Sequence, residues 1–202
     1  MSTLNKYGKF KALGKHKNKK QIILCHTSRE VDRYLTSLRF RYNERFDRIP
    51  NFIVTKRGEV LQLLDESSYT RFFYNEDVNK NSVIICLENL GWLEKKPLSN
   101  EYISWDGSIY NEKVYEKKWR DFFFWEPYSD IQITETSKIC SELIEFFQIK
   151  KSCVGHNTKV DGIERFEGIS TRSNYDQRFT DLNPSFNFEN FVKFLENEQF
   201  AQ

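Results

Sequence analysis

The chain has 202 residues, 39% hydrophobic and 16% aromatic, which is enough for one domain with a substantial core and too few for two. No apolar run reaches the roughly 18 to 20 residues of a membrane span, and the N-terminus lacks the apolar core of a secretory signal, so we expect a soluble protein made in the cytoplasm. The four cysteines lie far apart without a Cys-x-x-Cys motif, which favours reduced thiols over a disulfide framework.

The formal net charge of +2 is unevenly distributed along the chain. Residues 1–20 contain seven lysines and no acidic residue, so the remaining segment is net negative. We interpret residues 1–20 as a basic N-terminal arm and residues 21–202 as the globular domain. Such an arm can contact an anionic polymer, but its composition favours a solvated tail. Nucleic-acid binding is a weaker alternative, because no base-reading module follows the arm.

The first apolar run, Ile22–Cys25, is predicted to be a buried strand that ends at His26. Neighbouring residues of a strand point to opposite faces, so Cys25 and His26 are not expected to face the same cleft. Thr27 and Glu30 have the spacing of a capping box, which predicts the start of an amphipathic helix directly after the strand.

Two further β segments are predicted before residue 90. Residues 50–54 and 59–64 are typical of a hairpin, with Gly58 in its turn. The apolar residues 83–87 indicate a central strand, which ends in Glu88.

Residues 94–128 differ in composition from the rest of the chain. They are dense in aromatic rings and contain Asp106-Gly107, which predicts a tight hairpin turn. We expect this insertion to pack as a small appendage beside the sheet, and a ligand-binding wall is the alternative. Ser129 and Gln132 then have the spacing of a second capping box, at the start of an amphipathic helix.

The C-terminal part is predicted to contain one short strand and one helix. Cys153–His156 is expected to be the strand, followed by a long loop to Asp181, and Asn187 caps the final helix. Strands interleaved with helices predict an α/β fold: a single domain with a mixed central β-sheet flanked by helices.

Two histidines and one aspartate are candidate metal ligands. His26 and His156 each end a short apolar run, and Asp181 precedes the last helix. Two imidazoles and a carboxylate would give Zn²⁺ three protein ligands and leave a fourth position for water, as in catalytic zinc sites. Asp161 is closer to His156 in sequence and is the alternative carboxylate. Spacing alone gives only a weak signal for this site.

The order of these segments resembles the zinc-dependent N-acetylmuramoyl-L-alanine amidases, together with the peptidoglycan recognition proteins and phage amidase-type lysozymes, over roughly residues 21–195. The motifs that carry the resemblance are His26-Thr27-Ser28, Asn51-Phe52-Ile53-Val54, the strand Ser82–Leu87, Trp125-Glu126-Pro127-Tyr128, Gly155-His156 and the segment Thr180–Phe186 with Asp181, Pro184 and Phe186.

The resemblance implies that His26, His156 and Asp181 hold zinc, which polarises the scissile carbonyl and activates a water. It implies hydrolysis of the bond between N-acetylmuramic acid and L-alanine in peptidoglycan, by a phage-encoded endolysin or a virion-associated enzyme. The sequence departs from the family at three helper positions. Cys86 stands where many members have a glutamate base, and Pro50 and Phe179 stand where a tyrosine and a lysine are expected.

Other residues are candidates for the missing roles. Glu88 lies two residues after Cys86 on the same face of the strand and is the candidate base. Arg178 is the candidate to stabilise the oxyanion, and Asn51 and Asn89 are candidate substrate-binding residues. The missing helpers also leave an alternative function, that of a zinc-bearing, catalytically weak protein that binds wall fragments or serves as a virion structural component.

Overall fold

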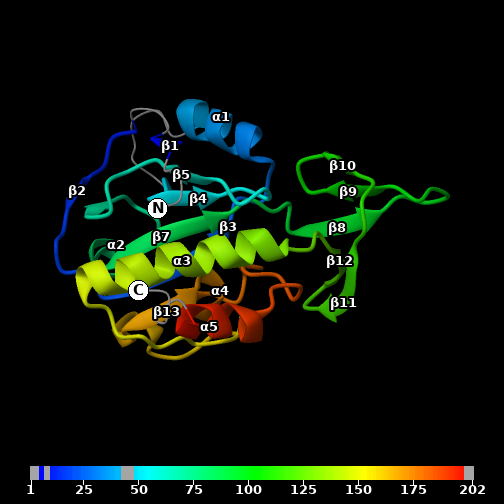
Figure 1. Cartoon of the computed structure of the whole chain (residues 1–202). Helices are drawn as coiled ribbons and strands as arrows, with labels where there is room; N and C mark the ends of the chain where they lie inside the picture. The colour runs from blue at the N-terminus through cyan, green and yellow to red at the C-terminus, as the bar shows by residue number, and fades with distance from the viewer. Residues whose placement is uncertain (1–4, 7–9, 42–47, 198–202) are drawn as a thin grey trace.

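The computed structural model describes residues 5–6, 10–41 and 48–197, and a six-stranded sheet forms its centre (Figure 1). In spatial order its strands are β1 (Asn5–Lys6), β5 (Val60–Gln62), β4 (Phe52–Val54), β7 (Ser82–Leu87), β3 (Gln21–His26) and β13 (Gly168–Thr171). The neighbours of β3 and β7 are parallel to them, whereas β4 and β5 form an antiparallel hairpin. The predicted mixed sheet and the predicted hairpin are therefore confirmed.

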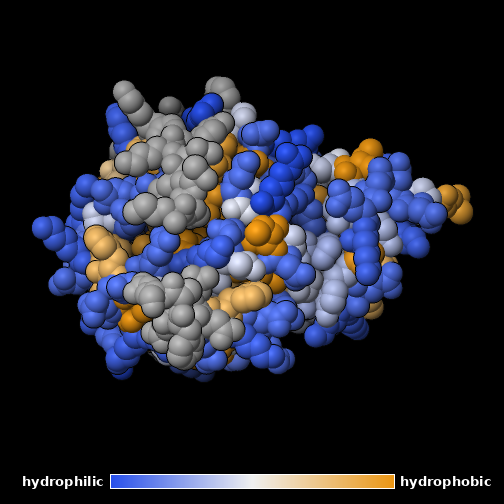
Figure 2. All heavy atoms as spheres, viewed as in Figure 1, coloured by the Kyte–Doolittle hydropathy of each residue, from blue (hydrophilic) through white to orange (hydrophobic). Residues whose placement is uncertain are grey.

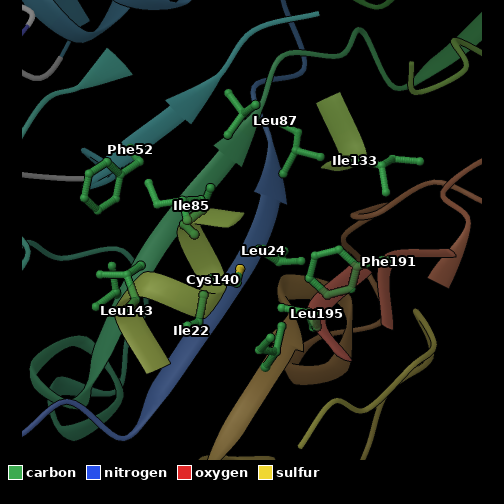
Figure 3. Packing of buried hydrophobic residues seen from close by; sticks show 14 of the residues in the cluster. Ile22, Leu24, Phe52, Ile85, Leu87, Ile133, Cys140, Leu143, Phe191 and Leu195 are labelled. Carbon is green, nitrogen blue, oxygen red and sulfur yellow. The ribbon is translucent and has the colours of Figure 1, made fainter. Parts of the chain in front are cut away.

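Two helices cover one face of the central sheet. They are α3 (Asp130–Phe147) and α5 (Phe188–Asn197), which run across the front of the sheet in Figure 1. Figure 3 shows Ile22 and Leu24 of β3 and Ile85 of β7 facing Cys140 of α3 and Phe191 of α5. Every residue of β3 and β7 is buried, because helices cover both faces of these parallel strands.

The opposite face packs against α1 (Val31–Arg41), α2 (Glu76–Asn81) and α4 (Arg172–Tyr175). Alternate residues of the same strands point to this side, among them Cys25 and Cys86, whose sulfur atoms lie 2.6 Å apart. All four cysteines are free thiols, as the spacing of the cysteines predicted.

The aromatic insertion forms a second sheet, which projects beside the first beyond one end of α3 (Figure 1). It contains β8 (Trp92–Lys95), β9 (Tyr102–Ser104), β10 (Ile109–Tyr110), β11 (Tyr115–Trp119) and β12 (Phe122–Trp125), all antiparallel. Tyr110 and Trp125 are buried, whereas Trp105 is 45% and Phe123 53% exposed. The packing interpretation is therefore confirmed for the inner rings, and the outer rings remain open to solvent.

The described part of the N-terminal arm belongs to the fold. β1 extends the central sheet, and β2 (Gly14–Lys15) pairs with β6 (Ser68–Tyr69). Lys19 is buried, and its ammonium donates to the carbonyl oxygens of Ser68, Lys80 and Ser82. This part of the arm is therefore paired with the domain and held at Lys19, while most of its side chains are exposed to solvent.

The face of the molecule seen in Figure 2 is mostly hydrophilic, with small and scattered hydrophobic patches. Among the described residues no helix is both long and apolar enough to cross a membrane.

Candidate functional site

Two of the three predicted metal ligands meet at the carboxyl end of β3. His26 Nε2 lies 3.0 Å from Asp181 Oδ1, and the backbone N–H of His26 donates to the same oxygen at 2.7 Å. Both side chains are buried, with exposed fractions of 3% and 0%. The imidazole and the carboxylate therefore form one contact inside the protein.

A third side chain, Arg172, completes this contact. Its Nε donates to Asp181 Oδ2 at 2.6 Å, and its Nη2 donates to Oδ1 at 2.9 Å. Arg172 is the first residue of α4 and directly follows Thr171, which pairs with Leu24 of β3, so strand register brings it beside the end of β3. We refer to His26, Asp181 and Arg172 as the ion triad.

The pKa values within the ion triad follow from burial and mutual charge. Burial raises the pKa of Asp181, but the nearby Arg172 and His26 outweigh it, so this pKa lies below its ordinary value. Burial lowers the pKa of His26, and Arg172 adds to this effect against the opposing influence of Asp181. A neutral His26 that donates from Nε2 leaves Nδ1 as an acceptor, and this buried atom has no hydrogen-bond partner among the described residues.

His156 does not join the ion triad. Its side chain is exposed, and its Nδ1 lies 2.9 Å from Thr158 Oγ1. The reason is β13, which the sequence analysis treated as part of a long loop. Cys153 pairs with Ile169 of β13, and Ile169 pairs with Ile22 of β3. The segment leading to His156 is therefore two strand spacings, about 10 Å, away from β3.

The donors present do not fit a zinc ion. Both oxygens of Asp181 already accept hydrogen bonds from a guanidinium, and this cation repels a second cation at the same carboxylate. Zinc sites in proteins use three or four ligands, whereas the described residues contain no group of three His, Cys, Asp or Glu side chains that can hold a metal. The alternative ligand Asp161 is fully exposed and pairs with Lys159.

Glu88, the candidate base, makes two backbone contacts. Its Oε1 accepts from the N–H of Val31 at 2.8 Å, and its Oε2 accepts from the N–H of Lys56 at 3.0 Å. Burial raises the pKa of Glu88 although these donors oppose the effect. Glu88, the residue after β7, thus caps the start of α1, whereas Thr27, the predicted cap, donates to the carbonyl of Arg29.

The other candidates are also held by the protein itself or by surface partners. Arg178 is exposed and pairs with Asp176, which is partly buried. The Asn51 amide donates to the carbonyls of residues 65 and 68 and accepts from the N–H of residue 84. The Asn89 amide donates to the carbonyl of Glu126 and accepts from the amide of Asn183. Both asparagines are buried and join segments of the fold.

A cavity of about 810 Å³ lies next to the ion triad. Its lining includes Arg48, Arg71, Phe72, Phe73, Tyr74, Tyr175 and Phe179. We call this cavity the aromatic pocket. The rings of Phe73 and Tyr175 lie 4.8 Å apart, and the Phe72 and Phe179 rings also contact the Arg172 guanidinium. The sequence analysis missed the pocket, although the run Arg71-Phe72-Phe73-Tyr74 was visible in the sequence.

Comparisons with known proteins agree with this architecture. The family model for N-acetylmuramoyl-L-alanine amidase matches residues 16–165, and this match ends before β13, Arg172 and Asp181. No curated protein sequence matches the chain.

Solved structures of low sequence identity share the fold. The amidase LysC from Clostridium intestinale URNW superposes with a TM-score of 0.59 at 12% identity, covering 97% of this chain and 99% of LysC. The endolysin amidase LysCS from the same organism gives 0.59 at 12% identity over 97% of both chains. The amidase AmiD from E. coli, solved with the substrate anhydro-N-acetylmuramic acid-L-Ala-D-gamma-Glu-L-Lys, gives 0.53 at 16% identity, covering 92% of this chain and 60% of AmiD.

Proposed function

Because the chain belongs to the N-acetylmuramoyl-L-alanine amidase family, we propose that it acts on peptidoglycan by hydrolysing the bond between N-acetylmuramic acid and L-alanine. The match over residues 16–165 is the observation that carries this proposal, and it confirms the enzyme class predicted from the sequence motifs. We further propose that the protein acts on the wall of a bacterial host, as a phage endolysin or a virion-associated enzyme.

We propose that the aromatic pocket holds the stem peptide of the substrate. A γ-linked glutamate, as in the ligand of AmiD, leaves its α-carboxylate free, and guanidinium groups bind carboxylates through paired hydrogen bonds. Arg48 and Arg71 are exposed and line the pocket, beside the tilted ring pair of Phe73 and Tyr175. The lining also contains the carboxylates of Glu76, Glu164 and Asp176, so the two guanidinium groups are the part of the lining that would bind a carboxylate. The volume of about 810 Å³ is in the usual range for ligand pockets.

The roles of Glu88 as base and Arg178 as oxyanion donor remain predictions from the sequence. Contact of the basic arm with an anionic wall polymer also remains a proposal. Lys19 is not part of this proposed polymer contact, because its ammonium is buried and donates to carbonyl oxygens.

The first test measures cleavage and binding on the same material. The purified chain is incubated with purified peptidoglycan and soluble muropeptides, and released stem peptides are identified by mass spectrometry. Arg71→Ala is expected to weaken muropeptide binding about tenfold, because it removes a charge-assisted contact. Arg57→Ala is the matched control, since Arg57 is an exposed arginine outside the pocket lining. Equal affinities of the two variants would remove the pocket from the proposal.

A second candidate function is muropeptide binding without hydrolysis, as a wall-binding or virion structural protein. One observation favours it: the Asp181 carboxylate is bound by Arg172. The same assay distinguishes the two functions. Stem-peptide release supports hydrolysis, whereas binding that Arg71→Ala weakens, without any released peptide, supports the second candidate.

A further inference from the structure

We propose that the ion triad replaces the metal centre expected for this fold, so that the chain folds and remains stable without zinc because Arg172 supplies the positive charge that buried Asp181 requires. This inference goes beyond the proposed function and does not depend on it, since it concerns what stabilises the site rather than what the site cleaves.

The hydrogen bonds of Asp181 are the first argument. Arg172 Nε and Nη2 donate to Asp181 Oδ2 and Oδ1 at 2.6 and 2.9 Å. This is bidentate geometry, which arginine can form and lysine cannot. The His26 N–H donates to one of these oxygens as well. A fully buried carboxylate is stable only when it is paired and hydrogen-bonded, and these contacts satisfy both conditions without a metal.

The surroundings of the guanidinium are the second argument. Arg172 Cζ lies 4.3 Å from the centroid of the Phe179 ring and 5.8 Å from that of Phe72. Aromatic faces attract cations, and this attraction is stronger at sites removed from water. Phe179 stands where the resemblance leads one to expect a lysine, and a second cation at this position would repel the Arg172 guanidinium.

The anchoring of α4 is the third argument. Asn174 is fully buried, and its Oδ1 accepts from the Thr171 N–H at 2.7 Å, which fixes the turn that carries Arg172. The Nδ2 of the same side chain donates to the carbonyls of His156 and Thr158. One buried amide therefore holds Arg172 next to Asp181 and also holds the His156 backbone at its place outside the triad.

The metal content of the intact protein tests the proposal directly. The full chain is purified from zinc-supplemented cultures, one half is treated with a chelator, and zinc content and melting temperature are measured on both halves. We expect far less than one zinc per chain and equal melting temperatures. About one zinc per chain, together with a lower melting temperature after chelation, would overturn the proposal. His156→Ala should change neither quantity, whereas a zinc ligand at this position would change both.

Variants of two arginines test the role of Arg172. Arg172→Ala is expected to lower the melting temperature by about 10 °C, because it leaves a buried carboxylate without its partner. Arg178→Ala is the matched control: it also removes the arginine of an arginine–aspartate pair, but Arg178 is 79% exposed and water can solvate the Asp176 carboxylate, which is 26% exposed, so the expected shift is less than about 2 °C.

If Arg172→Ala does not fold, Arg172→Lys serves in its place. This variant should fold, because it keeps the charge, and its melting temperature should be lower than that of the wild type, because it loses the paired hydrogen bonds. An Arg172 variant as stable as Arg178→Ala would overturn the proposal. The outcome is separate from that of the proposed function, because zinc content and melting temperature are read without any wall substrate.

Discussion

At the scale of single residues, a second buried carboxyl group lies near the site. Glu126 contacts the ammonium of Lys56 at 2.5 Å and accepts a hydrogen bond from the Leu90 N–H. Burial raises the pKa of Glu126 to about 6, although Lys56 opposes this effect. The burial cost therefore outweighs the attraction of the lysine.

This raised pKa predicts a pH dependence of stability. The folded-state pKa of Glu126 is above its ordinary value of 4.5, so its contribution to stability is complete below about pH 4.5 and is lost as the pH rises through about 6. The difference corresponds to about 2 kcal/mol. Between pH 4 and pH 7.5 the wild type should lose about 4 to 8 °C of melting temperature relative to Glu126→Gln. Glu101→Gln, at a half-exposed partner of Lys96, is the control, and parallel curves for wild type and Glu126→Gln would contradict the prediction.

The contacts of Glu88 lead to another prediction at the same scale. A glutamine at this position can accept from only one of the N–H groups of Val31 and Lys56, and an unpaired buried N–H costs about 1 to 3 kcal/mol. We expect Glu88→Gln to melt about 3 to 10 °C below wild type. If hydrolysis is found, a base at this position predicts that Glu88→Gln also lowers the rate by at least about tenfold, and the rate must be measured well below this melting temperature. Glu59→Gln, at an exposed glutamate of the hairpin, is the control.

At the scale of elements, the β9–β10 hairpin of the appendage is fastened to the segment before α1. Trp105 Nε1 donates to the carbonyl of Ser28 at 2.6 Å, and the Arg29 guanidinium lies 4.5 Å from the Trp105 ring centroid. Arg33 also donates to Ser108 Oγ at 2.8 Å. These contacts position the appendage next to the helix that follows His26.

This attachment predicts that Trp105→Ala destabilises the protein by about 1 to 2 kcal/mol although the ring is 45% exposed, because a hydrogen bond and a cation–π contact are lost together. Thermal melts give the size of the effect, and hydrogen exchange should become faster in the hairpin. Phe123→Ala is the matched control, since this ring is 53% exposed and contacts Lys118. Equal effects of the two substitutions would show that the contacts of Trp105 do not fasten the hairpin.

At the scale of the whole molecule, the central sheet separates two different surroundings. One face packs against α3 and α5 and forms the larger apolar cluster (Figure 3). The other face packs against α1, and Phe72, Phe73 and Tyr175 belong both to its apolar cluster and to the lining of the aromatic pocket. The pocket and the ion triad are neighbours because Phe72 and Phe179 contact both.

The sequence by itself determined the class of fold and most of its central elements. The runs that became β3 and β7, the hairpin around Gly58 and the helix capped by Ser129 were all predicted from the sequence. They were predictable because hydrophobic periodicity and capping depend on residues close together in the chain. The same local patterns, taken in order, identified the amidase family.

Only the tertiary structure decided which side chains meet at the site. β13 pairs with β3, although about 145 residues separate them in the sequence. This pairing brings the Arg172 guanidinium into hydrogen-bond contact with the Asp181 carboxylate and leaves His156 outside the ion triad. The start of α1 likewise depends on Glu88, which directly follows β7. Such contacts follow from strand order and from the need to pair a buried charge, and neither leaves a periodic signal in the sequence. Arg172 is therefore recognised as the partner of Asp181 only once β13 lies beside β3.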